Sequence, residues 1–98
     1  MNNTQQTKIG PTHGVPYRRV WIEGKHLAAA GFKPGDRYHR TEVRNGIIIT
    51  WSAEGKLKVS GKGDKPILDI SGSIIPRLFP QPTTHVTVSF SQRVITIR

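Results

Sequence analysis

The feature of this sequence that most constrains its fold is a strand–glycine–helix–phenylalanine–hairpin pattern that occurs twice within 98 residues. The first copy lies between Val20 and Ser52, and a fainter second copy ends the chain. Three residues recur 48 positions later: Ile22, Gly24 and Leu27 match Ile70, Gly72 and Ile75. Three more recur 47 positions later: Phe32, Ile47 and Ile48 match Phe79, Val94 and Ile95. Chance matching of common apolar residues is the alternative. We favour duplication, which predicts two small halves that share one core as a pseudo-dimer.

Local signals define the elements of each copy. A helix from Lys25 to Ala30 is too short to be stable alone, so packing must hold it. Gly31 suits the left-handed position that ends a helix. The dipeptide Asn45-Gly46, flanked by β-prone residues, predicts a hairpin between strands at 37–43 and 46–51. The second copy predicts a helix from Ser73 to Leu78, with Ser73 as its cap.

These elements predict a mostly β (α+β) fold, a small β-barrel with two short helices and two β-α-β-β half-repeats. Residues 1–14 are polar and are expected to form a flexible N-terminal tail or a loosely attached strand. Residues 15–98 form a single barrel domain, with half-repeats at 15–52 and 53–98. The alternation in Lys56 to Val59 and the glycine-rich turn that follows predict a second hairpin that ends in a strand from Pro66 to Ile70.

Charge is the strongest compositional signal. Fifteen Lys and Arg face six Asp and Glu, which gives a formal net charge of +9. Such an excess favours a polyanionic partner. No long amphipathic helix or apolar run favours a membrane. The chain has no cysteine, which excludes disulfides and thiolate metal sites, and its N-terminus lacks a signal-peptide layout. We therefore expect a cytoplasmic location, associated with the nucleoid if the partner is DNA.

The segment Val20 to Thr50, with IEGKHLAAAGFKPGDRY and then NGIIIT, resembles the SymE toxin family within the AbrB/SpoVT/MazE swapped-hairpin superfamily. The residues that carry the resemblance are Gly24, Lys25, Leu27, Ala30, Gly31, Phe32 and Gly35. The second half keeps the layout but lacks the AAGF. The resemblance implies a single-chain version of a swapped-hairpin barrel that normally takes two chains. It also implies a relation to DNA-binding regulators, to antitoxins and to toxins that act on nucleic acid.

Catalytic chemistry has little support in the sequence. The histidines His13, His26, His39 and His85 show no ligand spacing, and the six acidic residues are scattered. Hydrolysis of a phosphodiester needs an acid–base pair or a carboxylate-held metal. We expect no metal and no cofactor. His39 beside Arg40 is the one pairing considered for metal-free RNA cleavage, and a solvent-exposed strand histidine is the plainer interpretation.

Nucleic-acid binding has a better set of candidates. The superfamily layout implies phosphate and base contacts at Arg18, Arg19, Lys56, Lys58, Lys62 and Lys65, and Lys25, Arg37 and Arg40 complete the candidate set. Arginine can read guanine edges in a major groove, whereas lysine mostly positions the backbone. Each of these charges alone could be merely solvated. Tyr17, Trp21, Tyr38 and Trp51 could stack on unpaired bases, but both tryptophans lie in apolar segments and are expected in the core.

These observations lead to three hypotheses. The first is a non-catalytic regulator or DNA-coating factor that binds duplex DNA, with RNA as a possible ligand. The second is a SymE-like toxin that cleaves RNA. The third is a protein-interaction module of the antitoxin or phage-factor type. The repeat allows a monomeric pseudo-dimer, and an exposed edge strand would also allow a homodimer.

Overall fold

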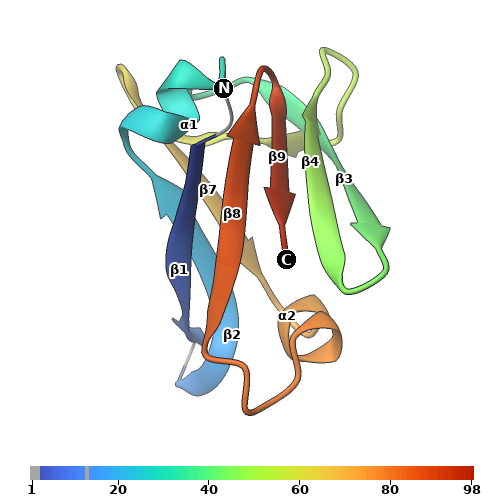
Figure 1. Ribbon diagram of the computed structural model, residues 1–98. Helices are drawn as coiled ribbons and strands as arrows, with labels where there is room; N and C mark the ends of the chain where they lie inside the picture. Colours follow the sequence, from blue (N-terminus) through green and yellow to red (C-terminus); the bar gives the residue numbers. More distant parts are fainter. Residues whose placement is uncertain (1–2, 13) are drawn as a thin grey trace.

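The backbone is dominated by one antiparallel sheet, which curls into a nearly closed barrel with a short helix near each end (Figure 1). The computed structural model describes residues 3–12 and 14–98, and over these residues the strand order is β5-β3-β4-β9-β8-β1-β2-β7-β6. The two outermost strands, β5 and β6, are consecutive in the chain and are separated only by Val59. The ends of the sheet therefore meet, which confirms the prediction of a mostly β, barrel-like fold with two short helices.

The elements have the following bounds. The strands are β1 (Asn3–Thr12), β2 (Val15–Glu23), β3 (Arg37–Val43), β4 (Gly46–Trp51), β5 (Leu57–Lys58), β6 (Ser60–Lys62), β7 (Lys65–Ser71), β8 (His85–Ser91) and β9 (Val94–Ile97). The helices are α1 (Lys25–Ala29) and α2 (Ile74–Leu78). Neither helix, in the described part of the chain, is long and apolar enough to cross a membrane.

Strand β1 decides between the two expectations for residues 1–14, because residues 3–12 form a strand and not a flexible tail. Residues 3–12 lie inside the sheet, paired with β8 from Asn3 to Lys8 and with β2 from Ile9 onward. The inward positions Gln5 and Thr7 are polar, and only Ile9 is fully buried. The alternation of apolar and polar residues that marks a half-buried strand is therefore missing from the sequence. Residues 1, 2 and 13 lie outside the described residues.

Two further pairings join the first half-repeat to the second. Strand β2 pairs with β7, where Val20 faces Ile70 and Ile22 faces Leu68. When each residue is replaced by its counterpart 48 positions away in the other copy, the pair Val20–Ile70 becomes Leu68–Ile22, which is the second pair. Strand β4 pairs with β9 in four residue pairs, Ile47–Ile97, Ile48–Thr96, Ile49–Ile95 and Thr50–Val94. Replacing each residue by its counterpart 47 positions away likewise converts Ile47–Ile97 into Val94–Thr50, and Ile48–Thr96 into Ile95–Ile49.

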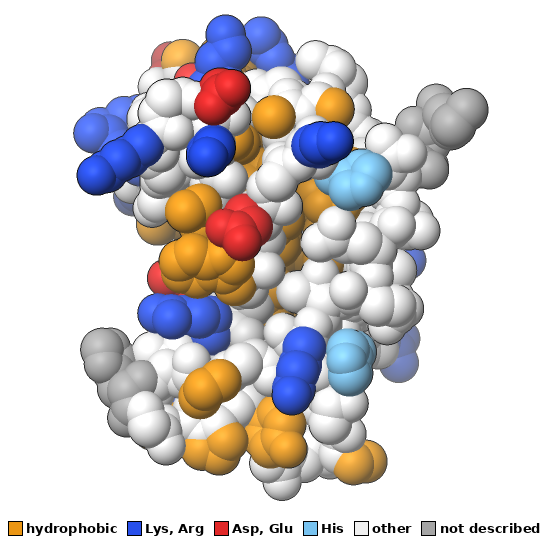
Figure 2. Space-filling model, turned by 90° about the vertical axis from the view of Figure 1, so that its left-hand side faces the viewer, with side chains coloured by type: hydrophobic (Ala, Val, Ile, Leu, Met, Phe, Trp, Pro, Cys, Tyr) orange, Lys and Arg blue, Asp and Glu red, His pale blue; other side chains and the backbone are white. Residues whose placement is uncertain are grey.

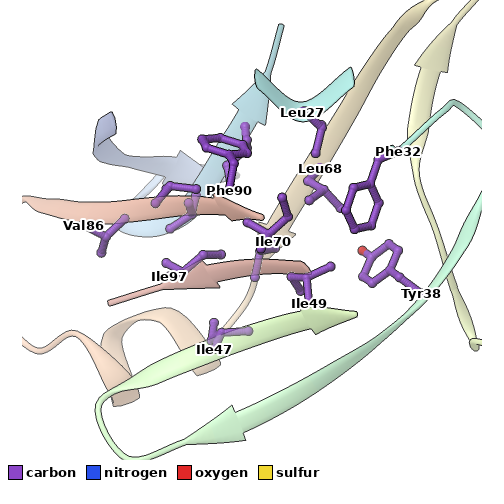
Figure 3. Packing of buried hydrophobic residues seen from close by; sticks show 14 of the residues in the cluster. Leu27, Phe32, Tyr38, Ile47, Ile49, Leu68, Ile70, Val86, Phe90 and Ile97 are labelled. Carbon is purple, nitrogen blue, oxygen red and sulfur yellow. The ribbon is translucent and has the colours of Figure 1, made fainter. Parts of the chain in front are cut away.

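The core fills the barrel with aliphatic and aromatic side chains from almost every strand (Figure 3). Leu27 of α1 and Phe32, just beyond it, point into the barrel beside Leu68 and Tyr38. Along β4 three isoleucines follow one another, a run typical of a strand buried on both faces, but the structure buries only alternate members. Ile47 and Ile49 are fully buried, but Ile48 between them is only half-buried. A strand in a one-layered barrel has one covered face, so its side chains alternate.

Each helix follows a glycine whose backbone conformation is easily adopted only by a residue without a Cβ atom. Gly24 precedes α1 with a φ of 98°, and Gly72 lies two residues before α2 with a φ of 110°. A left-handed backbone of this kind strains other residues. Both helices agree with the predicted ranges to within one residue at each end. The predicted capping role of Ser73 is wrong, because its hydroxyl makes no capping hydrogen bond.

Strand β3 is the most open edge of the barrel. It pairs with β5 only at Arg37 and Tyr38. Farther along, Glu42 lies on the same side of the strand as the buried Tyr38, and Arg77 of α2 donates two hydrogen bonds to its carboxylate, of 2.8 and 2.9 Å. These hydrogen bonds hold the pKa of Glu42 below its usual value. Helix α2 thus covers the open part of this edge, and a charged inward position discourages pairing with a further strand.

Candidate nucleic-acid interface

The nine basic residues predicted to bind nucleic acid lie at four places on the barrel. The groups are Lys25, Lys62 and Lys65 beside the start of α1; Arg18 and Arg19 on β2; Arg37, Lys56 and Lys58 where β3 meets β5; and Arg40 alone on β3. Seven of the nine are exposed, and the two β2 arginines are half-buried. The structure therefore does not arrange all nine in one continuous ribbon. Arg19, however, lies on the outer face of β2 and β7, the pair of strands at whose end the first group lies, whereas Arg18 projects to the same side of β2 as the buried Val20.

The first group lines a depression of about 1060 Å³ between α1 and the turn that joins β6 to β7. We call it the lysine depression. Lys25, Lys62 and Lys65 line it together with the apolar Ala28, Pro66 and Ile67 and the acidic Glu23 and Asp64. Figure 2 shows Lys and Arg side chains gathered at the upper left of the face that contains β2 and α1.

Local backbone geometry explains why these lysines converge. Lys25 follows Gly24, where the chain leaves β2 and turns into α1. The opposite wall is the tight turn around Lys62, in which Gly61 has a φ of 110°. A Cβ on Gly61 would also collide with the backbone oxygen of Lys65. Glycine is therefore required there, and it keeps Lys62 and Lys65 close to each other.

The charges of the depression are available to a ligand. Three ammonium groups and two carboxylates line it, so the cations exceed the anions by one (3 − 2). Within residues 3–12 and 14–98, neither Glu23 nor Asp64 forms an ion pair with a lysine, since the ion pairs found there join Arg19 to Asp69 and Arg77 to Glu42. An exposed lysine of this kind is a mobile point charge, suited to a phosphate group.

The outer face of β2 and β7 continues from this depression. Glu23 pairs with Ile67, and both residues line the depression. The next pair on the same face is Trp21 with Asp69. Beyond it lies Arg19, whose Nε is 3.0 Å from Asp69 Oδ1. The lysine depression and these three side chains thus form one strip along two neighbouring strands.

Trp21 is exposed, and the expectation that it belongs to the core is wrong. It retains 41% of its accessible surface, whereas its neighbours Val20 and Ile22 are fully buried. Alternation along a strand then forces the indole to the outside. The apolar segment Val20 to Ile22 led to the expectation of burial. The sequence of β2, VPYRRVWIE, does not alternate between apolar and polar residues, so no local signal places Trp21 on the outside.

The other aromatic candidates are less accessible. Tyr38 is buried in the core, and this burial raises the pKa of its hydroxyl. Trp51 is half-buried against the core, with the guanidinium carbon of Arg93 4.2 Å from its ring centre. Tyr17 is half-buried at a positive φ of 55°. Of the four aromatic residues considered for base stacking, Trp21 therefore offers the most surface.

The pairing considered for RNA cleavage does not converge. His39 and Arg40 are consecutive residues of β3, so their side chains project from opposite sides of the strand. His26 lies against the ring of Phe90, with 5.5 Å between ring centres, and His85 contacts Thr84. No three His, Asp or Glu side chains in the described residues are grouped in a way that could hold a metal ion.

Comparison of the chain with protein-family models, curated proteins and solved structures gives no match in any of the three. The resemblance to the swapped-hairpin superfamily therefore stays a prediction that rests on the sequence alone. Function is inferred from the geometry of the site.

Proposed function

We propose that this protein is a non-catalytic, cytoplasmic DNA-binding protein, a regulator or DNA-coating factor that holds the phosphate backbone of duplex DNA. The observation that carries the proposal is the convergence of Lys25, Lys62 and Lys65 on one depression, none of them in an ion pair within the described residues. Neutralising phosphates with such lysines releases counterions and supplies most of the affinity of a sequence-independent contact. The net charge of +9 adds long-range attraction.

The barrel is proposed to be a single-chain swapped-hairpin barrel that arose by duplication. The β2–β7 and β4–β9 registers support this, because each maps onto itself under the offset that relates the two copies. The order strand, helix, strand, strand also occurs twice, as β2-α1-β3-β4 and β7-α2-β8-β9. A monomer of this kind would offer one lysine depression to one stretch of DNA.

Sequence preference is assigned to arginines that have no acidic partner. Arg18, Arg37 and Arg40 form no ion pair in the described part of the chain, whereas Arg19 is held by Asp69. Arg37 donates a hydrogen bond of 3.2 Å to the backbone oxygen of Gly55, which leaves other guanidinium donors free. Bidentate contacts from arginine to guanine discriminate between bases, whereas the lysines only position the protein.

The test compares two variants of equal charge. Lys25→Gln, Lys62→Gln and Lys65→Gln together define the lysine variant. Its matched control changes Lys8, Arg44 and Arg98 to Gln, which are exposed residues that do not line the depression. Each variant removes three charges, from +9 to +6 (9 − 3). The long-range attraction is therefore lowered to a similar extent in both.

Binding to a labelled, fully paired duplex is measured by fluorescence anisotropy, with single-stranded DNA and RNA of the same sequence alongside. The lysine variant is expected to lose affinity on the order of 100-fold at physiological salt, because three fewer counterions are released. The control is expected to lose much less. Equal losses in the two variants would remove the lysine depression from the interface. An absence of duplex binding at low salt by the unaltered protein would refute DNA binding itself.

A further inference from the structure

Trp21 leaves a large apolar surface in solvent. Among the described residues, only Val15 and Trp21 are large hydrophobic residues with a highly exposed surface, at 40% and 41%. Burial of an aromatic side chain is strongly favourable, so an outward tryptophan on a strand offers surface for a partner. The middle of the face shown in Figure 2 carries a hydrophobic patch with acidic and basic side chains beside it.

The indole is held in place by its neighbours. Arg19 lies two residues before Trp21 and therefore on the same side of β2, with its guanidinium carbon 5.4 Å from the ring centre. Asp69, directly opposite Trp21 in the pairing with β7, binds the same guanidinium. The three side chains form what we call the tryptophan cluster. A ring fixed in this way loses little conformational entropy when a planar group stacks on it.

We propose that Trp21 is a stacking site for one unpaired base of a DNA strand whose phosphates lie along the lysine depression. This inference rests on the proposed function and extends it to the kind of DNA that is bound. Trp21 and Glu23 lie on the same face of β2, two residues apart, and Glu23 lines the depression. At about 3.3 Å per residue, the indole is therefore roughly 7 Å from the edge of the lysine depression. A base and a neighbouring phosphate of one strand can occupy the two places together.

The charges around the indole favour a base over a phosphate as the group that contacts it. The Arg19–Asp69 ion pair beside the ring leaves no net positive charge there for a phosphate, whereas an uncharged base can stack on the indole. The lysines lie at one end of the strip, and Arg19 lies at the other. This arrangement suits a strand that passes over the indole with its backbone held on both sides, as in single-strand binding surfaces.

The expected consequence is a preference for duplex DNA that carries a single-stranded overhang over the same duplex fully paired. The preference should be about 5- to 150-fold, the range that one base stacked on an aromatic side chain contributes. Trp21→Ala should lower binding of the overhang duplex to the level of the paired duplex. Trp21→Phe should keep part of the preference. Val15→Ala, which removes the other exposed hydrophobic residue, should keep all of it.

A second readout reports the contact directly. A Trp51→Phe variant leaves Trp21 as the single tryptophan of the chain. Stacking of a base on its ring should quench its emission when the overhang duplex is added, and the fully paired duplex should quench it far less. Thermal unfolding of each variant checks that the barrel is intact.

The outcomes separate the two proposals. If the paired duplex binds but the overhang adds no affinity, or if Trp21→Ala keeps the preference, the stacking site is refuted and the proposed DNA binding stands. Unchanged Trp21 emission at saturating overhang duplex would also refute stacking. If neither DNA binds, the proposed function itself is refuted.

Discussion

The two strand–helix junctions of this barrel share a backbone plan but differ at the surface. Both have a glycine of positive φ followed by a helix of five residues. Leu27 of α1 and Ile75 of α2 occupy equivalent, fully buried positions. Around α1, however, Lys25 and the lysines of the β6–β7 turn have no acidic partner in the described residues, whereas Arg77 of α2 is bound to Glu42.

The difference shows that the same backbone arrangement can carry two different sets of surface charges. At the α2 junction the cation stabilises the molecule, because it fastens the helix to the open edge of β3. At the α1 junction the cations surround a depression and remain open to a ligand. The residues that repeat are those that fold the barrel, and the residues that differ are those on which the proposed function depends. The following substitutions test this division.

The largest effect is expected from the buried helix residues. Leu27→Ala and Ile75→Ala should each lower the free energy of unfolding by about 2 to 5 kcal/mol, through lost burial and a new cavity. Urea denaturation measures both losses. Because the positions are equivalent, the two losses should be similar. A loss below about 1 kcal/mol at one of them would show that the two helices do not play the same part in the core.

A smaller effect is expected at the junction glycines. Gly24→Ala and Gly72→Ala should each cost about 1 to 3 kcal/mol, because alanine is strained at a φ near +100° even where no atom is close. Gly10→Ala is the matched control, since its surroundings are equally open and its φ is not left-handed. If the control loses as much stability as the junction variants, the positive φ is not the cause.

The smallest effect is expected from the ion pair of the α2 junction. Arg77 lowers the pKa of Glu42, so the native state takes up a proton at lower pH than the unfolded state, whose pKa is near 4.5. The pair therefore contributes stability above that value and loses it as the pH falls below it. When the pH is lowered from about 6 to about 3, the free energy of unfolding of Arg77→Gln should therefore fall by less than that of the unaltered protein. The difference is small, because exposed pairs contribute little.

The control for this pH series is Glu54→Gln, which removes an exposed carboxylate that forms no ion pair in the described part of the chain. This variant should follow the unaltered protein through the same pH range. A pH dependence in Arg77→Gln identical to that of the unaltered protein would show that the Arg77–Glu42 ion pair contributes no measurable stability.

Much of the fold follows from local sequence signals. The Asn45-Gly46 dipeptide correctly predicts the turn between β3 and β4, and Asn45 adopts the positive φ of 60° that such turns require. The helices follow from glycine punctuation and from buried residues at helical spacing. Strand β1 could not be predicted, because its inward positions Gln5 and Thr7 are polar and its place depends on pairing with the distant strand β8.

The candidate site was predictable only in part. A glycine-rich turn that exposes Lys62 is visible in the sequence, but its position beside Lys25 depends on the pairing of β2 with β7. The same pairing places Glu23 in the depression and Asp69 beside Trp21. Such contacts link residues more than forty positions apart, as the pairing of Trp21 with Asp69 illustrates, and no local pattern encodes them.

The salt dependence of duplex binding tests the central claim most directly. The logarithm of the binding constant, plotted against the logarithm of the salt concentration, should have a steep negative slope for the unaltered protein. Loss of Lys25, Lys62 and Lys65 should make this slope less negative by about 2.7, three phosphates at about 0.9 each. The control with Lys8, Arg44 and Arg98 changed should keep nearly the original slope. Equal slopes for the lysine variant and the unaltered protein would contradict the account, because the three lysines would then neutralise no phosphate.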